Sequence, residues 1–138
     1  MCIKKKILFV CIENSCRSQI AEGFVNNLGR AVLEAYSAGS RPSGKINPLA
    51  IEVMQELGID ISKQWSKGFG DLAVKDFDYV ITMGCLDTCP VVPARKHIDW
   101  QIDDPKGKPQ ESFRKARDQI KEKINDFIKQ ELQTWKGD

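Results

Sequence analysis

The chain has 138 residues, of which 41% are hydrophobic and 29% are charged. Its 21 basic and 19 acidic residues leave a net charge of +2, so no basic excess points to nucleic acid or to a membrane surface. No apolar run approaches the ~20 residues of a membrane span, and the run over 7–12 is too short for a signal peptide. We therefore expect one cytoplasmic domain over residues 1–138 that acts as a monomer and binds neither nucleic acid nor membrane.

Strand-like and helix-like segments alternate along the chain. Strands appear as short apolar runs, and helices as apolar residues at steps of three and four. In chain order, we predict a strand over 5–10, a helix over 18–28, a strand over 31–38, a helix over 47–58, a short helix over 71–77, strands over 79–83 and 96–100, and a long helix over 113–132. The alternation predicts an α/β fold of three layers, a four-stranded parallel sheet flanked by helices on both faces.

Three polar segments follow predicted strands. They begin at Cys11, at Gly84 with Cys85, and at Asp103 with Asp104. Ligands of such folds bind beyond the carboxyl ends of the strands, so we expect these segments to meet at one edge of the sheet.

Cys11 and Arg17 lie six positions apart at a strand-to-helix turn. Such a turn can wrap its backbone N–H groups around a tetrahedral oxyanion, and the helix N-terminus adds a positive field. Arg17 can bind two oxygens at once. The same field favours the thiolate of Cys11, to which Ser18 could donate a hydrogen bond, so Cys11 is a candidate nucleophile. Taken as an isolated pair, the two residues would instead indicate a buried cysteine and a helix-starting arginine.

The predicted oxyanion loop also contains polar and sulfur side chains. Its members between the nucleophile and the helix are Glu13, Asn14, Ser15, Cys16 and Arg17. We expect Cys16 to be a structural thiol. We expect Glu13 to face solvent, because an inward carboxylate would oppose anion binding.

Cys85 and Cys89 follow the third predicted strand. They could be incidental thiols, zinc ligands together with Cys11 and Cys16, or a redox pair. The spacings differ from the usual paired zinc ligands, which favours the redox interpretation. We expect no bound metal and no cofactor.

The motif Cys11-x5-Arg17-Ser18-Gln19-x-Ala21-Glu22-Gly23 resembles the signature of the low-molecular-weight tyrosine phosphatases. Within that fold, it is most similar to the thioredoxin-coupled arsenate reductases. The likeness extends over nearly the whole chain, through Tyr36-Ser37-Ala38-Gly39, Asn47-Pro48, Gly58-Ile59-Asp60-Ile61-Ser62 and Asp104-Pro105-x-Gly107.

This resemblance implies reduction of arsenate, a small oxyanion, by a relay of thiols. Cys11 would attack arsenic, Cys85 would attack Cys11, and Cys89 would complete a disulfide that thioredoxin or a similar thiol reductant reduces. Asp104, in isolation a turn residue, would protonate the leaving oxygen. Asp103 is the less favoured candidate for that role.

Two other functions stay open. One is a phosphotyrosine phosphatase in which Cys85 and Cys89 protect Cys11 from oxidation. The other is a metal- or arsenite-binding regulator that uses the same thiols. The sequence Lys106-Gly107-Lys108 stands where such phosphatases often carry aromatic residues, which favours a small inorganic oxyanion.

Some members of the resembled family bind potassium through asparagine, glutamate, serine and aspartate. Asn14, Glu22 and Ser37 match the first three, and Lys67 stands in the place of the aspartate. An ammonium group there could replace the ion, so we predict no potassium dependence.

Overall fold

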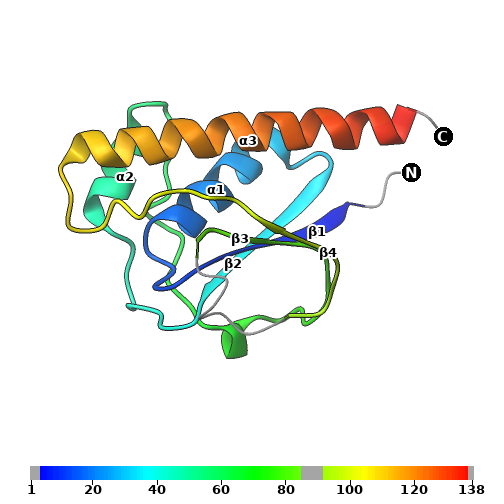
Figure 1. Ribbon diagram of the computed structural model, residues 1–138, viewed down its shortest axis with the longest axis horizontal. Coiled ribbons are helices and arrows are strands. Elements are labelled where there is room, and N and C mark those ends of the chain that lie inside the picture. Colours follow the sequence, from blue (N-terminus) through cyan, green and yellow to red (C-terminus); the bar gives the residue numbers. More distant parts are fainter. Residues whose placement is uncertain (1–3, 85–91, 137–138) are drawn as a thin grey trace.

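The computed structural model describes residues 4–84 and 92–136, and Cys85 and Cys89 lie outside these ranges. The elements are β1 (Lys5–Cys11), α1 (Arg17–Phe24), β2 (Leu33–Gly39), α2 (Pro48–Gln55), β3 (Phe77–Thr82), β4 (Ala94–Asp99) and α3 (Gln110–Lys136). The four strands form one parallel sheet in the order β2-β1-β3-β4 (Figure 1). The predicted four-stranded parallel sheet is thus confirmed.

The central strand β1 is buried on both faces, as its continuous apolar run predicts. Ile7 and Phe9 belong to the core on the helical side of the sheet, whereas Leu8 and Val10 belong to the smaller core on the other side. This alternation follows from the two-residue period of a strand.

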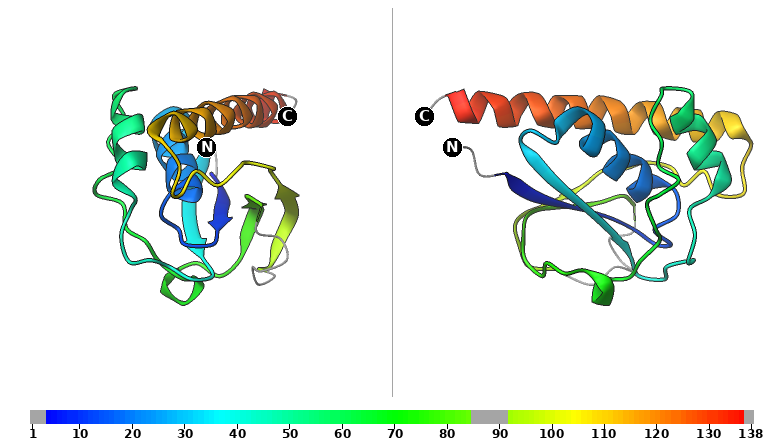
Figure 2. Two further views of the ribbon diagram at one scale, coloured as in Figure 1. Left: turned by 60° about the vertical axis from the view of Figure 1, so that its left-hand side comes forward. Right: turned by 180° about the vertical axis from the view of Figure 1, so that it is seen from behind.

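The three α-helices lie on the same face of the sheet (Figures 1 and 2). Phe24 of α1, Met54 of α2 and Phe113 of α3 are fully buried in one core with Ile7 and Phe9. Asn47 caps α2 by accepting a hydrogen bond from the backbone N–H of Leu49. Helix α1 continues as a π-helical turn over Val25–Gly29.

The opposite face is covered by the segment that leads into β3. We expected a helix over 71–77, and this prediction is wrong. The chain makes a 3₁₀ turn over Phe69–Asp71 and then runs extended to β3, which begins at Phe77. Leu72 and Phe77 are buried against the sheet there. A short apolar run is ambiguous between helix and extended chain, and burial against a flat sheet favours the extended form. Within the described residues, the third layer is therefore this segment rather than an α-helix.

No helix in residues 4–84 and 92–136 combines the length and the apolar character needed to cross a bilayer.

Candidate active site

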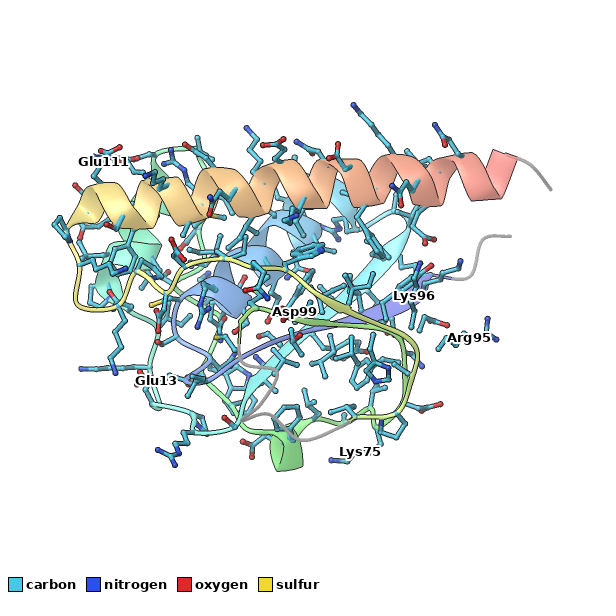
Figure 3. The ribbon with its side chains drawn as sticks, viewed as in Figure 1. Glu13, Lys75, Arg95, Lys96, Asp99 and Glu111 are labelled. Atoms are coloured by element: carbon cyan, nitrogen blue, oxygen red, sulfur yellow. The ribbon has the colours of Figure 1, made fainter. Side chains whose placement is uncertain are left out.

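The carboxyl end of β1, the loop that leads into α1 and the chain after β4 surround a small cavity. Its lining consists of Cys11, Glu13, Ser15, Cys16, Arg17, Asp104 and Lys106. Figure 3 shows Glu13 at this end of the molecule, far from Arg95 and Lys96 on β4. The predicted oxyanion loop and the Asp104 loop therefore meet at one edge of the sheet, as the topology requires.

The loop between β1 and α1 is held from outside through its carbonyl groups. The Ile12 carbonyl accepts a hydrogen bond from the Arg41 N–H at 2.8 Å. The Glu13 carbonyl accepts one from Ser66 Oγ at 2.9 Å. The Ser15 carbonyl accepts one from the Asn47 N–H at 3.0 Å. The C=O and N–H of one peptide unit point in opposite directions, so the N–H groups are directed to the inside of the loop. This arrangement of backbone dipoles suits a concave anion-binding site.

Asn14 is the fully buried centre of this loop. Its φ of 52° lies in the left-handed region, which asparagine tolerates better than most residues. Its Oδ1 accepts from the backbone N–H of Lys67 and from Gln19 Nε2, both at 2.8 Å. Its Nδ2 donates to Ser18 Oγ, also at 2.8 Å. Asn14 therefore joins the loop, helix α1 and the chain before Gly68 into one network.

Ser18 lies beside the candidate nucleophile. Its Oγ is 2.8 Å from Sγ of Cys11, and both side chains are buried. Because Asn14 already donates to this hydroxyl, the hydroxyl hydrogen is available for the sulfur. This geometry suits stabilisation of a thiolate at Cys11.

Arg17 is anchored by backbone carbonyls of two other segments. Its Nη1 donates to the carbonyls of Met83 and Ile102, the latter at 2.9 Å, and its Nη2 lies 3.6 Å from Oδ2 of Asp104. Its Nε is buried and has no hydrogen-bond partner in the part of the chain that the structure describes. A buried donor without an acceptor is costly, by about 1–3 kcal/mol, so the site is suited to receive an oxyanion.

The two candidate acids are separated by the structure. Asp104 lines the cavity of Cys11, is 47% exposed, and accepts a hydrogen bond from the Lys106 N–H at 3.0 Å. Asp103 does not line the Cys11 cavity; it lines, together with Asp104, a neighbouring cavity of about 220 Å³ between this loop and the start of α3. Only Asp104 has the position that a proton donor for this pocket requires.

Glu13 does not face solvent alone, contrary to our expectation. Its carboxylate lines the cavity and forms an ion pair with Nζ of Lys106. The hydrogen bond to Glu13 raises the pKa of Lys106. The ammonium compensates the negative charge, which is why a carboxylate can stand at the edge of an anion site.

Cys16 is buried and lies 3.7 Å from Oγ of Ser15. Burial raises the pKa of its thiol to about 11. It therefore stays protonated near neutral pH, as a structural thiol would.

Gly84 brings the chain to Arg17 immediately before Cys85. Its φ of +85° suits glycine, and a Cβ on it would lie 3.1 Å from Nη1 of Arg17. The Gly84 N–H donates to Asp99 at 3.3 Å.

From the sequence, Gly39 is placed just after a predicted strand and within the motif Tyr36-Ser37-Ala38-Gly39, but no role in the oxyanion loop is predicted for it. A Cβ there would lie 2.5 Å from the Ile12 carbonyl oxygen and 2.8 Å from the Asn14 nitrogen, so only glycine lets the oxyanion loop pack on β2. A glycine directly after a strand that adjoins the loop-bearing strand was the available signal.

Lys67 occupies the place where the potential potassium ligands converge. Its buried ammonium donates to Ser37 Oγ at 3.1 Å and to the Trp65 carbonyl at 3.0 Å, and it lies 3.5 Å from a carboxylate oxygen of Glu22. The absence of potassium dependence stays a prediction, which this geometry supports. Within the described ranges, no three His, Cys, Asp or Glu side chains are placed to hold a metal ion.

A sequence model described as low molecular weight phosphotyrosine protein phosphatase matches residues 6–136. The chain belongs to this family. Within the phosphatase family, an arsenate reductase of Staphylococcus aureus (strain Newman) is 43% identical over 128 residues, which are 90% of this chain and 96% of that protein. A glutaredoxin arsenate reductase of Synechocystis sp. is 42% identical over 127 residues, with 90% and 96% covered.

The solved structures that this chain resembles also include arsenate reductases. An arsenate reductase in its phosphate-binding state superposes with a TM-score of 0.81 at 40% identity, covering 91% of this chain and 98% of that one. A thioredoxin-dependent arsenate reductase of Corynebacterium glutamicum has a TM-score of 0.76 at 32% identity, covering 95% of this chain and 63% of that one. The chain therefore groups with the arsenate reductases of the phosphatase family, and the fold of a four-stranded parallel sheet with three helices is confirmed. The prediction of helices on both faces is wrong for the described residues, because α1, α2 and α3 share one core on one face.

Proposed function

We propose that the protein reduces arsenate to arsenite by a thiol relay. Arsenate binds in the loop from Cys11 to Arg17. The Cys11 thiolate attacks arsenic and forms a sulfur–arsenic bond, while Asp104 protonates the departing oxygen, which leaves as water. The buried Nε of Arg17 gains its acceptor from the bound anion.

The two electrons come from a second thiol. Cys85 attacks the sulfur of Cys11, so a disulfide forms and the sulfur–arsenic bond breaks. Arsenic keeps the bonding pair and leaves as arsenite. Cys89 then attacks Cys85 and releases Cys11 as thiolate, and a thioredoxin-like dithiol reduces the resulting Cys85–Cys89 disulfide.

The observation that carries this proposal is the closeness of Gly84 to Arg17. A Cβ on Gly84 would lie 3.1 Å from Nη1 of Arg17, and Gly84 is the residue before Cys85 in the sequence. The similarity to named arsenate reductases supports the same reaction. One relative is named for glutaredoxin and another for thioredoxin, so the reductant is a small dithiol protein, for which we favour thioredoxin. The relay requires reduced thiols, which fits action in the cytoplasm. We further propose that the chain acts as a single-domain monomer.

The test is NADPH oxidation with thioredoxin, thioredoxin reductase and arsenate, beside hydrolysis of p-nitrophenyl phosphate by the same preparation. We expect sustained arsenate-dependent NADPH loss. Cys11→Ser should abolish both activities, whereas Cys85→Ser should abolish only the reduction. Cys89→Ser should release at most one arsenite per enzyme, and Cys2→Ser is the matched control because Cys2 has no role in the relay.

Fast ester hydrolysis without arsenate-dependent NADPH loss would overturn the proposal. It would identify the protein as a phosphatase, with Cys85 and Cys89 as protective thiols. Retained turnover in Cys11→Ser would remove Cys11 as the nucleophile.

A further inference from the structure

We propose that Glu13 and Lys106 select the substrate class by forming an ion pair across the mouth of the anion pocket. The pair can close over a small inorganic oxyanion but not over a phosphate ester. This inference rests on the proposed function and specifies its substrate.

The two residues come from opposite walls of the pocket and lie 93 positions apart in the chain. Glu13 belongs to the loop after β1, and Lys106 follows Asp104 and Pro105. Both line the cavity that contains Cys11 and Arg17. Their side chains are 30% and 54% exposed, so the pair lies at the entrance rather than at the base.

The cavity under this pair is very small. Its volume is about 10 Å³, roughly the space of one water molecule and less than a tetrahedral oxyanion needs. An oxyanion therefore reaches Cys11 only when side chains that line the cavity move apart, and we assign this movement to the Glu13–Lys106 pair. The partial exposure of both side chains allows this, because each charge can be solvated while the pair is open.

The difference between substrates arises after entry. All oxygens of an inorganic oxyanion can lie inside the loop, so the pair can form again above it. An ester carries a carbon group on the oxygen that leaves the pocket, and this group occupies the space where Glu13 and Lys106 meet. The pair then stays open, and an uncompensated Glu13 carboxylate faces the bound anion. Both effects disfavour the ester.

The expected discrimination is modest and measurable. Loss of a partly exposed ion pair changes an equilibrium constant, here that for substrate binding, by at most about fivefold. Removing the bulk of both side chains also removes the steric obstruction. If this contributes about a further twofold, we expect about tenfold for truncating variants, because the two factors multiply.

The experiment compares kcat/KM for p-nitrophenyl phosphate with that for arsenate in two double variants. E13Q/K106M keeps the local charge sum and approximate size, and E13G/K106A removes the side chains. The ester-to-arsenate ratio should rise about fivefold in the first and about tenfold in the second. The ratio cancels general charge effects, since both substrates are anions.

K108M/E111Q is the charge-matched control, because it removes one positive and one negative charge from residues that do not line the Cys11 cavity. Its ratio should equal that of the unaltered protein. A ratio that is unchanged in E13Q/K106M and E13G/K106A, with melting temperatures maintained, would overturn the inference.

A second readout separates this inference from the proposed function. Inorganic phosphate and phenylphosphonate should each protect Cys11 from modification by iodoacetamide. Mass spectrometry measures the modified fraction of Cys11, and this assay requires no catalytic turnover. E13G/K106A should strengthen protection by phenylphosphonate relative to phosphate. If the protein reduces no arsenate, the proposed relay is wrong, but the protection assay still tests whether the Glu13–Lys106 pair selects the substrate. Equal protection ratios in all variants would reject this role of the pair, whatever the result with arsenate.

Discussion

The two walls of the anion pocket are built differently. The loop between β1 and α1 is bound by residues from three other segments, and its central Asn14 is fully buried. The facing loop is open to solvent: Asp104 is 47% exposed and Lys106 is 54% exposed. Its described ionic contacts to the first wall are Asp104 with Arg17 and Lys106 with Glu13.

This difference indicates that the two walls have different roles in the site. In the proposed mechanism, the first wall holds the candidate nucleophile Cys11 and the N–H groups of its loop in place before substrate arrives, which avoids reorganisation during the reaction. The second wall carries the two groups to which we assign proton transfer and movement, Asp104 and Lys106 respectively. Substitutions in one wall at a time test this difference.

The largest expected effect is on the open wall. D104N should lower kcat for arsenate reduction by about 10²–10⁴-fold, because the departing oxygen loses its proton donor. Hydrolysis of p-nitrophenyl phosphate should fall less, since nitrophenolate leaves more readily without protonation. D103N is the control, and an equal loss in D103N would show that Asp103 carries or shares the acid role.

Substitution of Gly39, on which the loop of the buried wall packs, should lower the rate of the reaction. G39A places a Cβ within 2.8 Å of two backbone atoms of the loop. The loop must shift, and misplacement of reacting groups by about 1 Å costs about 10²-fold in rate. Steady-state kinetics and thermal melting measure this. G70A is the matched control, because nothing lies within 4 Å of the corresponding Cβ position.

Lys67 supports the buried wall through charge. K67M leaves the Glu22 carboxylate without its ammonium partner, which should destabilise the fold by about 3 kcal/mol. We expect the unaltered protein to melt equally in KCl and NaCl, whereas K67M should regain part of its stability in KCl. A potassium response of the unaltered protein would contradict the replacement of the ion by Lys67.

The smallest effect concerns the two thiols of the buried wall. The pKa of Cys16 is raised to about 11, so at pH 8 only about one molecule in a thousand carries the reactive thiolate. Iodoacetamide at pH 8 should therefore modify Cys11 and spare Cys16, as peptide mass spectrometry can measure. Raising the pH toward 11 should increase modification of Cys16, and equal rates for both thiols at pH 8 would contradict this account.

Local patterns in the sequence determined the frame of the site. The apolar run of β1 and the stripe of α1 enclose Cys11 and Arg17, so the strand, the turn and the helix could be predicted from neighbouring residues alone. The alternation of elements also determined that Cys11 and Asp104 would meet at one edge of the sheet. The short segment over 71–77 was mispredicted, because its Leu-Ala-Val run suits a helix or an extended chain equally well.

Only the tertiary structure decided how the two walls are held. The contacts of Gly39 with Ile12, of Arg17 with the carbonyls of Met83 and Ile102, and of Glu13 with Lys106 join residues that are distant in the chain. Periodicity and spacing report which face a side chain occupies within its own element. They do not report which partner from another element meets it, because that depends on how the sheet and its loops pack in space.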